Sequence, residues 1–96
     1  MTLGSYELDS FDFTEGKLTW KVLISGVRLV PEKIVIDSVV ASFVYQKGRK
    51  VSVVEVKANT ISGEIPTGDP ESVGKRIEAK VKEIIQAILD SSERLT

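Results

Sequence analysis

The sequence predicts an α+β domain in which a four-stranded antiparallel meander sheet carries one C-terminal helix packed on one face, in the order β-β-β-β-α. Two observations predict this fold. Apolar residues alternate along four segments between positions 6 and 61, which is typical of strands with one buried face. After position 69 they recur at spacings of three and four, which indicates an amphipathic helix. We expect residues 1–96 to form a single α+β domain.

The first two strands are expected to form a hairpin. Residues 6–13 alternate, but the parity of the apolar positions changes at Asp9-Ser10, which predicts a β-bulge. Gly16 can take a positive φ in the turn that follows. The second strand changes parity at Gly26 in the same way, which predicts a further bulge or a sharp bend.

The aromatic side chains all lie in predicted strands, so we expect most of them in the core. A hairpin register that matches the apolar positions sets Phe11 and Phe13 beside Leu18 and Trp20, and such a cluster adds stability beyond simple burial. The aromatic residues are Tyr6, Phe11, Phe13, Trp20, Phe43 and Tyr45.

A turn is expected at 30–33, and residues 34–45 and 50–61 then indicate a second hairpin with Gly48 at its tip. Two valine pairs in these strands are apolar on both faces, whereas one helix covers only one face. The second face is therefore predicted to meet a partner or a second copy. The candidate interaction residues are Val40, Val54 and the basic tip residues Lys47, Arg49 and Lys50. A solvated tip that blocks aggregation is the favoured explanation of the basic residues.

The helix is expected to begin after Asp69, a good N-cap, with Pro70 in the first position. A close approach of the helix to the sheet would explain Gly74. No glycine or proline ends the helix, so residues 91–96 are expected to fray. The apolar face contains Val73, Ile77, Val81, Ile84, Ile85 and Ile88. The opposite face, expected to point to solvent, contains Lys75, Glu78, Lys82, Gln86 and Glu93.

Composition excludes several kinds of chemistry. The chain has no cysteine and no histidine, which removes disulfides, thiolate zinc sites and imidazole acid–base catalysis. Thirteen Lys and Arg against 14 Asp and Glu give a net charge of −1, which disfavours nucleic-acid binding. No apolar run reaches the roughly 18 residues of a membrane-spanning helix. We expect no enzyme activity, no cofactor and no metal.

An acidic group near the first hairpin offers oxygen atoms that could bind a hard cation such as calcium. Calcium binding and a solvated strand face are the two explanations of these residues, and no EF-hand spacing favours the first. The acidic residues are Glu7, Asp9, Asp12 and Glu15.

The second half of the chain resembles one family. A strand, a Gly48-Arg49 turn, a second strand, a Ser-Gly-Glu-Ile-Pro loop and a closing amphipathic helix follow one another. Over residues 36–90 this order resembles the C-terminal part of the ABC-transport auxiliary lipoproteins. The resemblance implies a periplasmic protein that assists lipid or lipopolysaccharide traffic at the bacterial outer membrane. The lipid-anchored cysteine and the N-terminal strand-and-helix portion of that family are absent here, and no functional residue is carried over.

Two functions follow as hypotheses. The first is a non-catalytic protein-interaction or assembly module that binds another protein or itself, as a homodimer, through its sheet. The alternative is a domain that binds a small hydrophobic or lipid ligand between helix and sheet. A complete chain implies a cytoplasmic location, and a trimmed signal or anchor implies a periplasmic or extracellular one. The candidate ligand-facing residues are Trp20, Phe43, Ile77 and Ile84.

Overall fold

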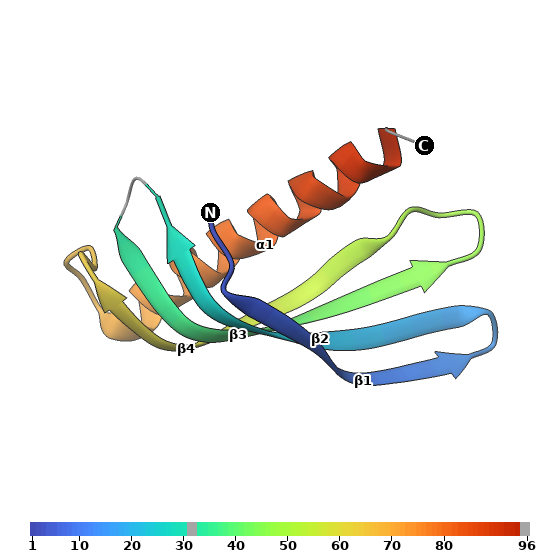
Figure 1. Ribbon diagram of the computed structural model, residues 1–96, viewed down its shortest axis with the longest axis horizontal. Helices are drawn as coiled ribbons and strands as arrows, with labels where there is room; N and C mark the ends of the chain where they lie inside the picture. Colours follow the sequence, from blue (N-terminus) through green and yellow to red (C-terminus); the bar gives the residue numbers. More distant parts are fainter. Residues whose placement is uncertain (31–32, 95–96) are drawn as a thin grey trace.

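The structure is a computed structural model that describes residues 1–30 and 33–94. Within these residues, four strands form one antiparallel sheet in the order β1-β2-β3-β4, and a helix follows the last strand (Figure 1). The predicted α+β meander with a terminal helix is confirmed. Parts of the turn expected at 30–33 and of the frayed end expected at 91–96 lie outside the described residues. The elements are β1 (Ser5–Thr14), β2 (Lys17–Leu29), β3 (Ile34–Gln46), β4 (Ser52–Gly63) and α1 (Pro70–Arg94).

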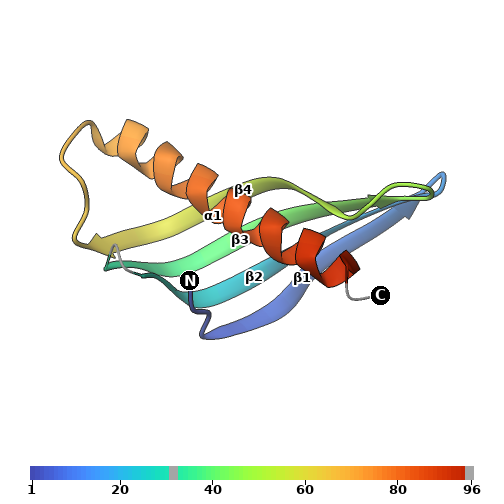
Figure 2. The same ribbon diagram turned by 90° about the horizontal axis from the view of Figure 1, so that it is seen from above.

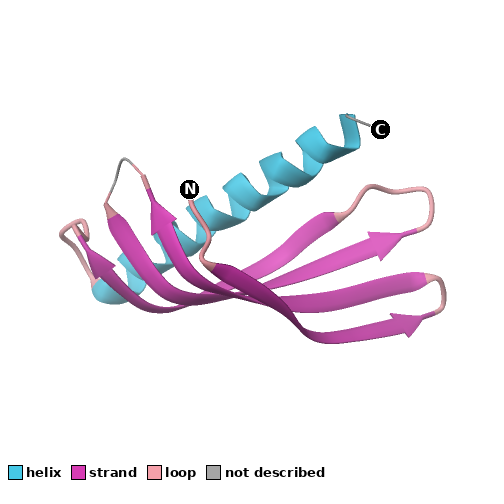
Figure 3. Cartoon of the chain, in the orientation of Figure 1, coloured by secondary structure: helices cyan, strands magenta, loops and turns pink. Residues whose placement is uncertain are grey.

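The helix crosses one side of a curved sheet. Figure 3 shows the strands bending around the side on which α1 lies. Seen from above, α1 begins near the end of β4 and runs diagonally over the sheet (Figure 2). The buried residues of β2, β3 and β4 pack against the apolar face of this helix. The core therefore lies between α1 and the concave side of the sheet.

The first hairpin has the predicted register. β1 pairs with β2 so that Phe11 lies opposite Trp20 and Phe13 opposite Leu18. The register shifts at Asp9, which confirms the expected β-bulge. The connecting turn has positive φ at both Glu15 (52°) and Gly16 (76°), a backbone conformation that matches the twist of a two-residue hairpin.

In three neighbouring strands, the alternation of buried and exposed residues shifts by one position, and the three shifts lie side by side along one line across the sheet. Gly26 of β2 and Thr60 of β4 both have positive φ, 68° and 57°, and Asp37 of β3 lies between them in the register. On β3 the residues on either side of this line, Ile36 and Val39, are both fully buried although they are three positions apart. The expected irregularity at Gly26 is thus part of a bend that runs through β2, β3 and β4 and keeps one apolar face.

Apolar packing and a capped helix hold the structure together. The ring of Trp20 stacks on Phe43 with centroids 5.4 Å apart and planes 13° apart. Each large aliphatic side chain that is fully buried contributes on the order of 2 kcal/mol. The core residues are Ile24, Val27, Leu29, Ile34, Ile36, Val39, Ala41, Phe43, Val53, Val56, Val73, Ile77, Val81 and Ile85.

The start of α1 confirms one expectation and corrects another. Oδ2 of Asp69 accepts hydrogen bonds from the backbone N–H of Ser72 at 3.1 Å and from its hydroxyl at 3.3 Å, so Asp69 is the N-cap. The close approach expected at Gly74 is wrong, because a Cβ placed there would meet nothing within 4 Å. The residue before it, Val73, is the one that packs into the core at this turn.

Candidate interaction surface

The two edges of the sheet differ in whether other parts of the protein cover them. Side chains of α1 form hydrogen bonds with the β4 edge. The backbone N–H of Val53 donates to Oε1 of Gln86 at 2.9 Å, and that of Ala58 donates to Oε2 of Glu78 at 2.7 Å. Nε2 of Gln86 also donates to the carbonyl oxygen of Val51 at 3.3 Å. These bonds satisfy backbone groups that would otherwise be open to pairing with another strand.

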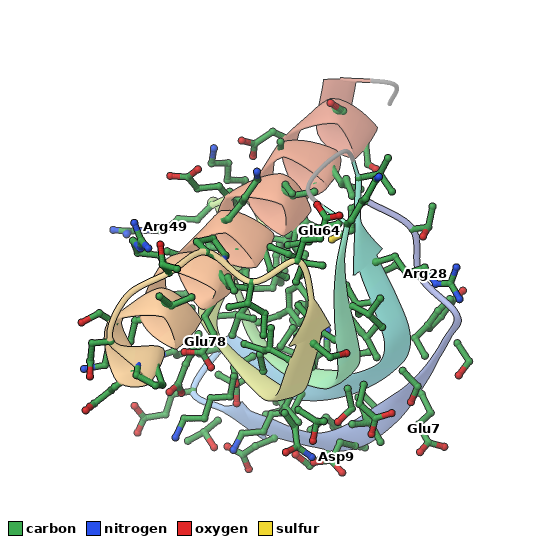
Figure 4. All side chains as sticks on the ribbon, turned by 90° about the vertical axis from the view of Figure 1, so that its left-hand side faces the viewer. Glu7, Asp9, Arg28, Arg49, Glu64 and Glu78 are labelled. Carbon is green, nitrogen blue, oxygen red and sulfur yellow. The ribbon has the colours of Figure 1, made fainter. Side chains whose placement is uncertain are left out.

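The expectation that Glu78 and Gln86 point to solvent is therefore wrong. Both are half-buried, because α1 runs beside β4 and meets it with a polar flank as well as with its apolar face. Figure 4 shows Glu78 between the helix and the sheet. The signal that sequence reasoning missed is topological: the last strand of a meander is an edge strand, and its outward N–H groups need partners.

The basic tip belongs in part to this same edge. Nζ of Lys50 lies 3.0 Å from Oδ1 of Asp90 on the helix, which also accepts a hydrogen bond from Gln86 at 3.1 Å. Lys47 and Arg49 remain exposed in the turn around Gly48, and Figure 4 shows Arg49 on the outside of the molecule. Of the three predicted tip residues, Lys50 is thus tied to the helix and the other two face solvent.

The β1 edge is open. All ten residues of β1 are exposed, and in the described sheet no strand lies beyond it. Its apolar residues pair in register with Ile24, Val22, Trp20 and Leu18 of β2, so they share the face of the sheet that carries the helix. The apolar residues of β1 and their exposed fractions are Tyr6 (76%), Leu8 (59%), Phe11 (69%) and Phe13 (66%).

The prediction of a core position is therefore wrong for most of the aromatic residues. Phe43 is buried and Trp20 half-buried, whereas the three aromatic residues of β1 and Tyr45 are exposed. The physical reason is the placement of α1, which begins and is anchored along β4, the strand farthest from β1 in the sheet. The exposed apolar residues of β1 form a row, which we call the β1 apolar row: Tyr6, Leu8, Phe11 and Phe13.

The other face of β1 is acidic. The alternation along the strand places Glu7, Asp9 and Asp12 opposite the β1 apolar row, and Figure 4 shows Glu7 and Asp9 pointing away from the helix. Oδ2 of Asp12 accepts a hydrogen bond from the hydroxyl of Thr14 at 2.9 Å. Within the described residues, no three acidic side chains converge into a group that could hold a metal ion.

Val40 and Val54 lie on the face that α1 does not cover. Val54 is the extra residue of a bulge between the pairs Ser42–Glu55 and Phe43–Val53, and it is 55% exposed. Val40 is half-buried and lies opposite Leu23 and Lys57. This second face is thus a mixture of valines and charged residues, and it is less apolar than the predicted self-association surface.

The four predicted ligand-facing residues are divided between two depressions and the core. Ile77 lines a groove of about 380 Å³ between the end of β4, the following loop and the start of α1. Trp20 and Phe43 line a separate depression of about 490 Å³ on the sheet. Ile84 is half-buried and packs against the core. These residues do not converge on one cavity between helix and sheet.

Comparisons with protein-family models, with curated proteins and with solved structures find no match. The resemblance to ABC-transport auxiliary lipoproteins thus stays a prediction. Among the described helical residues, no segment combines the length and apolarity that crossing a membrane requires.

Proposed function

We propose that the chain is a non-catalytic protein-interaction module that binds an extended segment of another polypeptide along β1. The observation that carries the proposal is the difference between the two sheet edges. Side chains of α1 occupy the β4 edge, whereas β1 offers ten exposed residues with no covering element in the described structure. Natural sheets normally block a long apolar edge, so an edge left open is a candidate binding site.

Strand addition uses the groups that β1 presents. The outward N–H and C=O groups of an edge strand supply the hydrogen bonds for a further strand, and alternate side chains supply the specificity. The β1 apolar row lies on the helix side of the sheet, where an added strand would extend the apolar face of β2 and β1. Exposed apolar surface of this kind marks interaction sites in soluble proteins.

Selection from a random peptide display library tests this function without assuming a partner. Selected peptides are expected to slow amide hydrogen exchange in β1 and to lose binding when Leu8→Lys and Phe11→Lys are combined. Val54→Lys is the matched control, since it adds a charge to an exposed apolar position on the opposite face. Peptides that protect another segment, or a library that yields no enrichment over an unrelated protein, would argue against β1 as the binding site.

A second candidate function rests on the groove beside Ile77. Its lining includes Ile61, Ile65, Pro66 and Val73, so its walls are mostly apolar, and its volume of about 380 Å³ suits a small hydrophobic ligand. Gly74 also lines the groove and leaves it open, because no atom occupies the space of a Cβ there. This candidate agrees with the lipid-related role that the family resemblance implies.

Native mass spectrometry and solvent extraction of the freshly purified protein test the second candidate. A bound apolar molecule of a few hundred daltons, lost in the Gly74→Leu variant, is the expected result because leucine would fill the groove. Recovery of no apolar molecule from the wild-type protein would count heavily against this function.

A further inference from the structure

We propose that the segment bound along β1 is a strand in which basic side chains alternate with apolar ones. This inference rests on the proposed function and adds the chemistry of the partner. It follows from the two rows of side chains that β1 presents: the β1 apolar row on the helix side, and Glu7, Asp9 and Asp12 on the other side.

A strand added beside β1 continues the pleat of the sheet, so its own side chains alternate between the same two faces. Side chains on the helix side would lie next to Tyr6, Leu8, Phe11 or Phe13 and are therefore expected to be apolar. Side chains on the other face would lie beside carboxylates, and opposite charges in directly opposed cross-strand positions stabilise pairing.

The negative charge of this edge is only partly balanced by the protein itself. Residues 1–16 contain four carboxylates and no lysine or arginine. β2 contributes Lys21, opposite Ser10, and Lys17, opposite Thr14, whereas Glu7 lies opposite Leu23. In the described part of the chain, the side-chain carboxylates of Glu7 and Asp9 have no ion pair within 4 Å and accept no hydrogen bond. Basic side chains of a partner would supply the missing countercharge.

A second copy of the chain is the less favourable occupant at neutral pH. Antiparallel pairing of two β1 strands can match the apolar rows, with Tyr6 opposite Phe13 and Leu8 opposite Phe11. The same register sets Glu7 opposite Asp12, and the two-fold symmetry repeats this contact. Like charges in opposed positions are destabilising. A basic side chain of a partner would instead be attracted at the positions where a second copy places a carboxylate against a carboxylate.

Two synthetic peptides test the inference. The probe is a ten-residue peptide of alternating lysine and valine, matched in length to β1, and its twin has glutamate in place of every lysine. We expect the lysine peptide to bind about tenfold more tightly than its twin. The lysines form several exposed ion pairs with the carboxylates of β1, whereas the glutamates of the twin are repelled by the same carboxylates. Binding is expected to weaken in high salt and to slow amide exchange within Ser5–Thr14.

Charge-reversed protein variants provide the second arm. The double variant Glu7→Lys with Asp12→Lys is expected to reverse the preference between the two peptides. Glu64→Lys with Glu83→Lys makes the same change in net charge at exposed positions on the β4–α1 loop and on the helix, and it is expected to keep the wild-type preference.

Three other outcomes would each overturn the inference, the proposed function or both. Equal binding of both peptides at β1 would overturn the inference about charge and leave the proposed edge function standing. If neither peptide protects β1 at millimolar concentration, both are overturned. Protection of β1 in the absence of peptide, in a dimer, would assign the edge to a second copy and overturn the basic partner.

Discussion

Oε1 of Gln86 accepts a hydrogen bond from the backbone N–H of Val53 at 2.9 Å, so a helix side chain takes the place that a neighbouring strand would occupy. The same side chain donates to the carbonyl oxygen of Val51. One glutamine therefore pairs with a donor on the outer edge of β4 and with an acceptor in the residue just before that strand. The helix α1 therefore covers the core and also blocks strand pairing at one edge of the sheet.

Replacing Gln86 by leucine is expected to destabilise the protein by about 1–3 kcal/mol, because the partly buried N–H of Val53 loses its acceptor. Urea unfolding gives the free energy, and faster amide exchange at Val53 locates the effect. Lys82→Leu is the matched control on an exposed position of the same helix. An equal loss of stability in the two variants would show that the hydrogen bonds of Gln86 contribute nothing specific.

Glu78 is predicted to act as a hydrogen-bond acceptor rather than as a charge. Its Oε2 lies 2.7 Å from the backbone nitrogen of Ala58, on the side of β4 where the described sheet has no further strand. Glu78→Ala should cost about 1–3 kcal/mol because it leaves the partly buried N–H of Ala58 without its acceptor, whereas Glu78→Gln keeps an acceptor and should cost less. Thermal or urea unfolding of both variants checks this order. Equal costs would mean that the charge, and not the acceptor, is what stabilises the edge.

Two phenylalanines on the same face of the sheet should differ sharply in their contribution to stability. Phe43 is 8% exposed and stacks on Trp20, so Phe43→Ala should cost about 3–5 kcal/mol. Phe11 is 69% exposed, and Phe11→Ala should cost less than about 1 kcal/mol. Equilibrium unfolding measures both. A large loss at Phe11 would mean that the β1 apolar row is covered in solution.

Alanine substitutions at two glycines are expected to change the stability of the protein in opposite directions. Gly74→Ala should stabilise α1 by about 0.5–1 kcal/mol, because the added methyl group enters open space and alanine is the better helix former. Gly63→Ala should destabilise the protein, since Gly63 has φ of 96° and an added Cβ would clash with the carbonyl oxygen of Lys33. Their melting temperatures should move in opposite directions. A lower stability of Gly74→Ala would show that a methyl group cannot be accommodated in the groove beside Ile77.

Features that depend on local pattern could be predicted from the sequence. The bulge at Asp9, the pairing of Phe11 with Trp20 and the Asp69 cap each follow from parity, turn geometry or capping chemistry within a few residues. The path of α1 across the sheet depends instead on tertiary contacts such as those of Glu78 and Gln86. Alternation alone therefore predicts a core position for Phe11, and only the placement of the helix shows that β1 is left open.

Self-association through the sheet face that α1 leaves uncovered can be tested at Val54. If two sheets pair face to face, Val54 would be buried in the dimer, and Val54→Lys should give a folded monomer because an unpaired charge is costly to bury. In the monomer Val54 is 55% exposed at a bulge, so the substitution should change stability by less than about 0.5 kcal/mol. Native mass spectrometry at two concentrations measures the oligomeric state of both proteins. An unchanged state would show that this face is not the contact, and a dimer that survives Val54→Lys would direct attention to the open edge of β1.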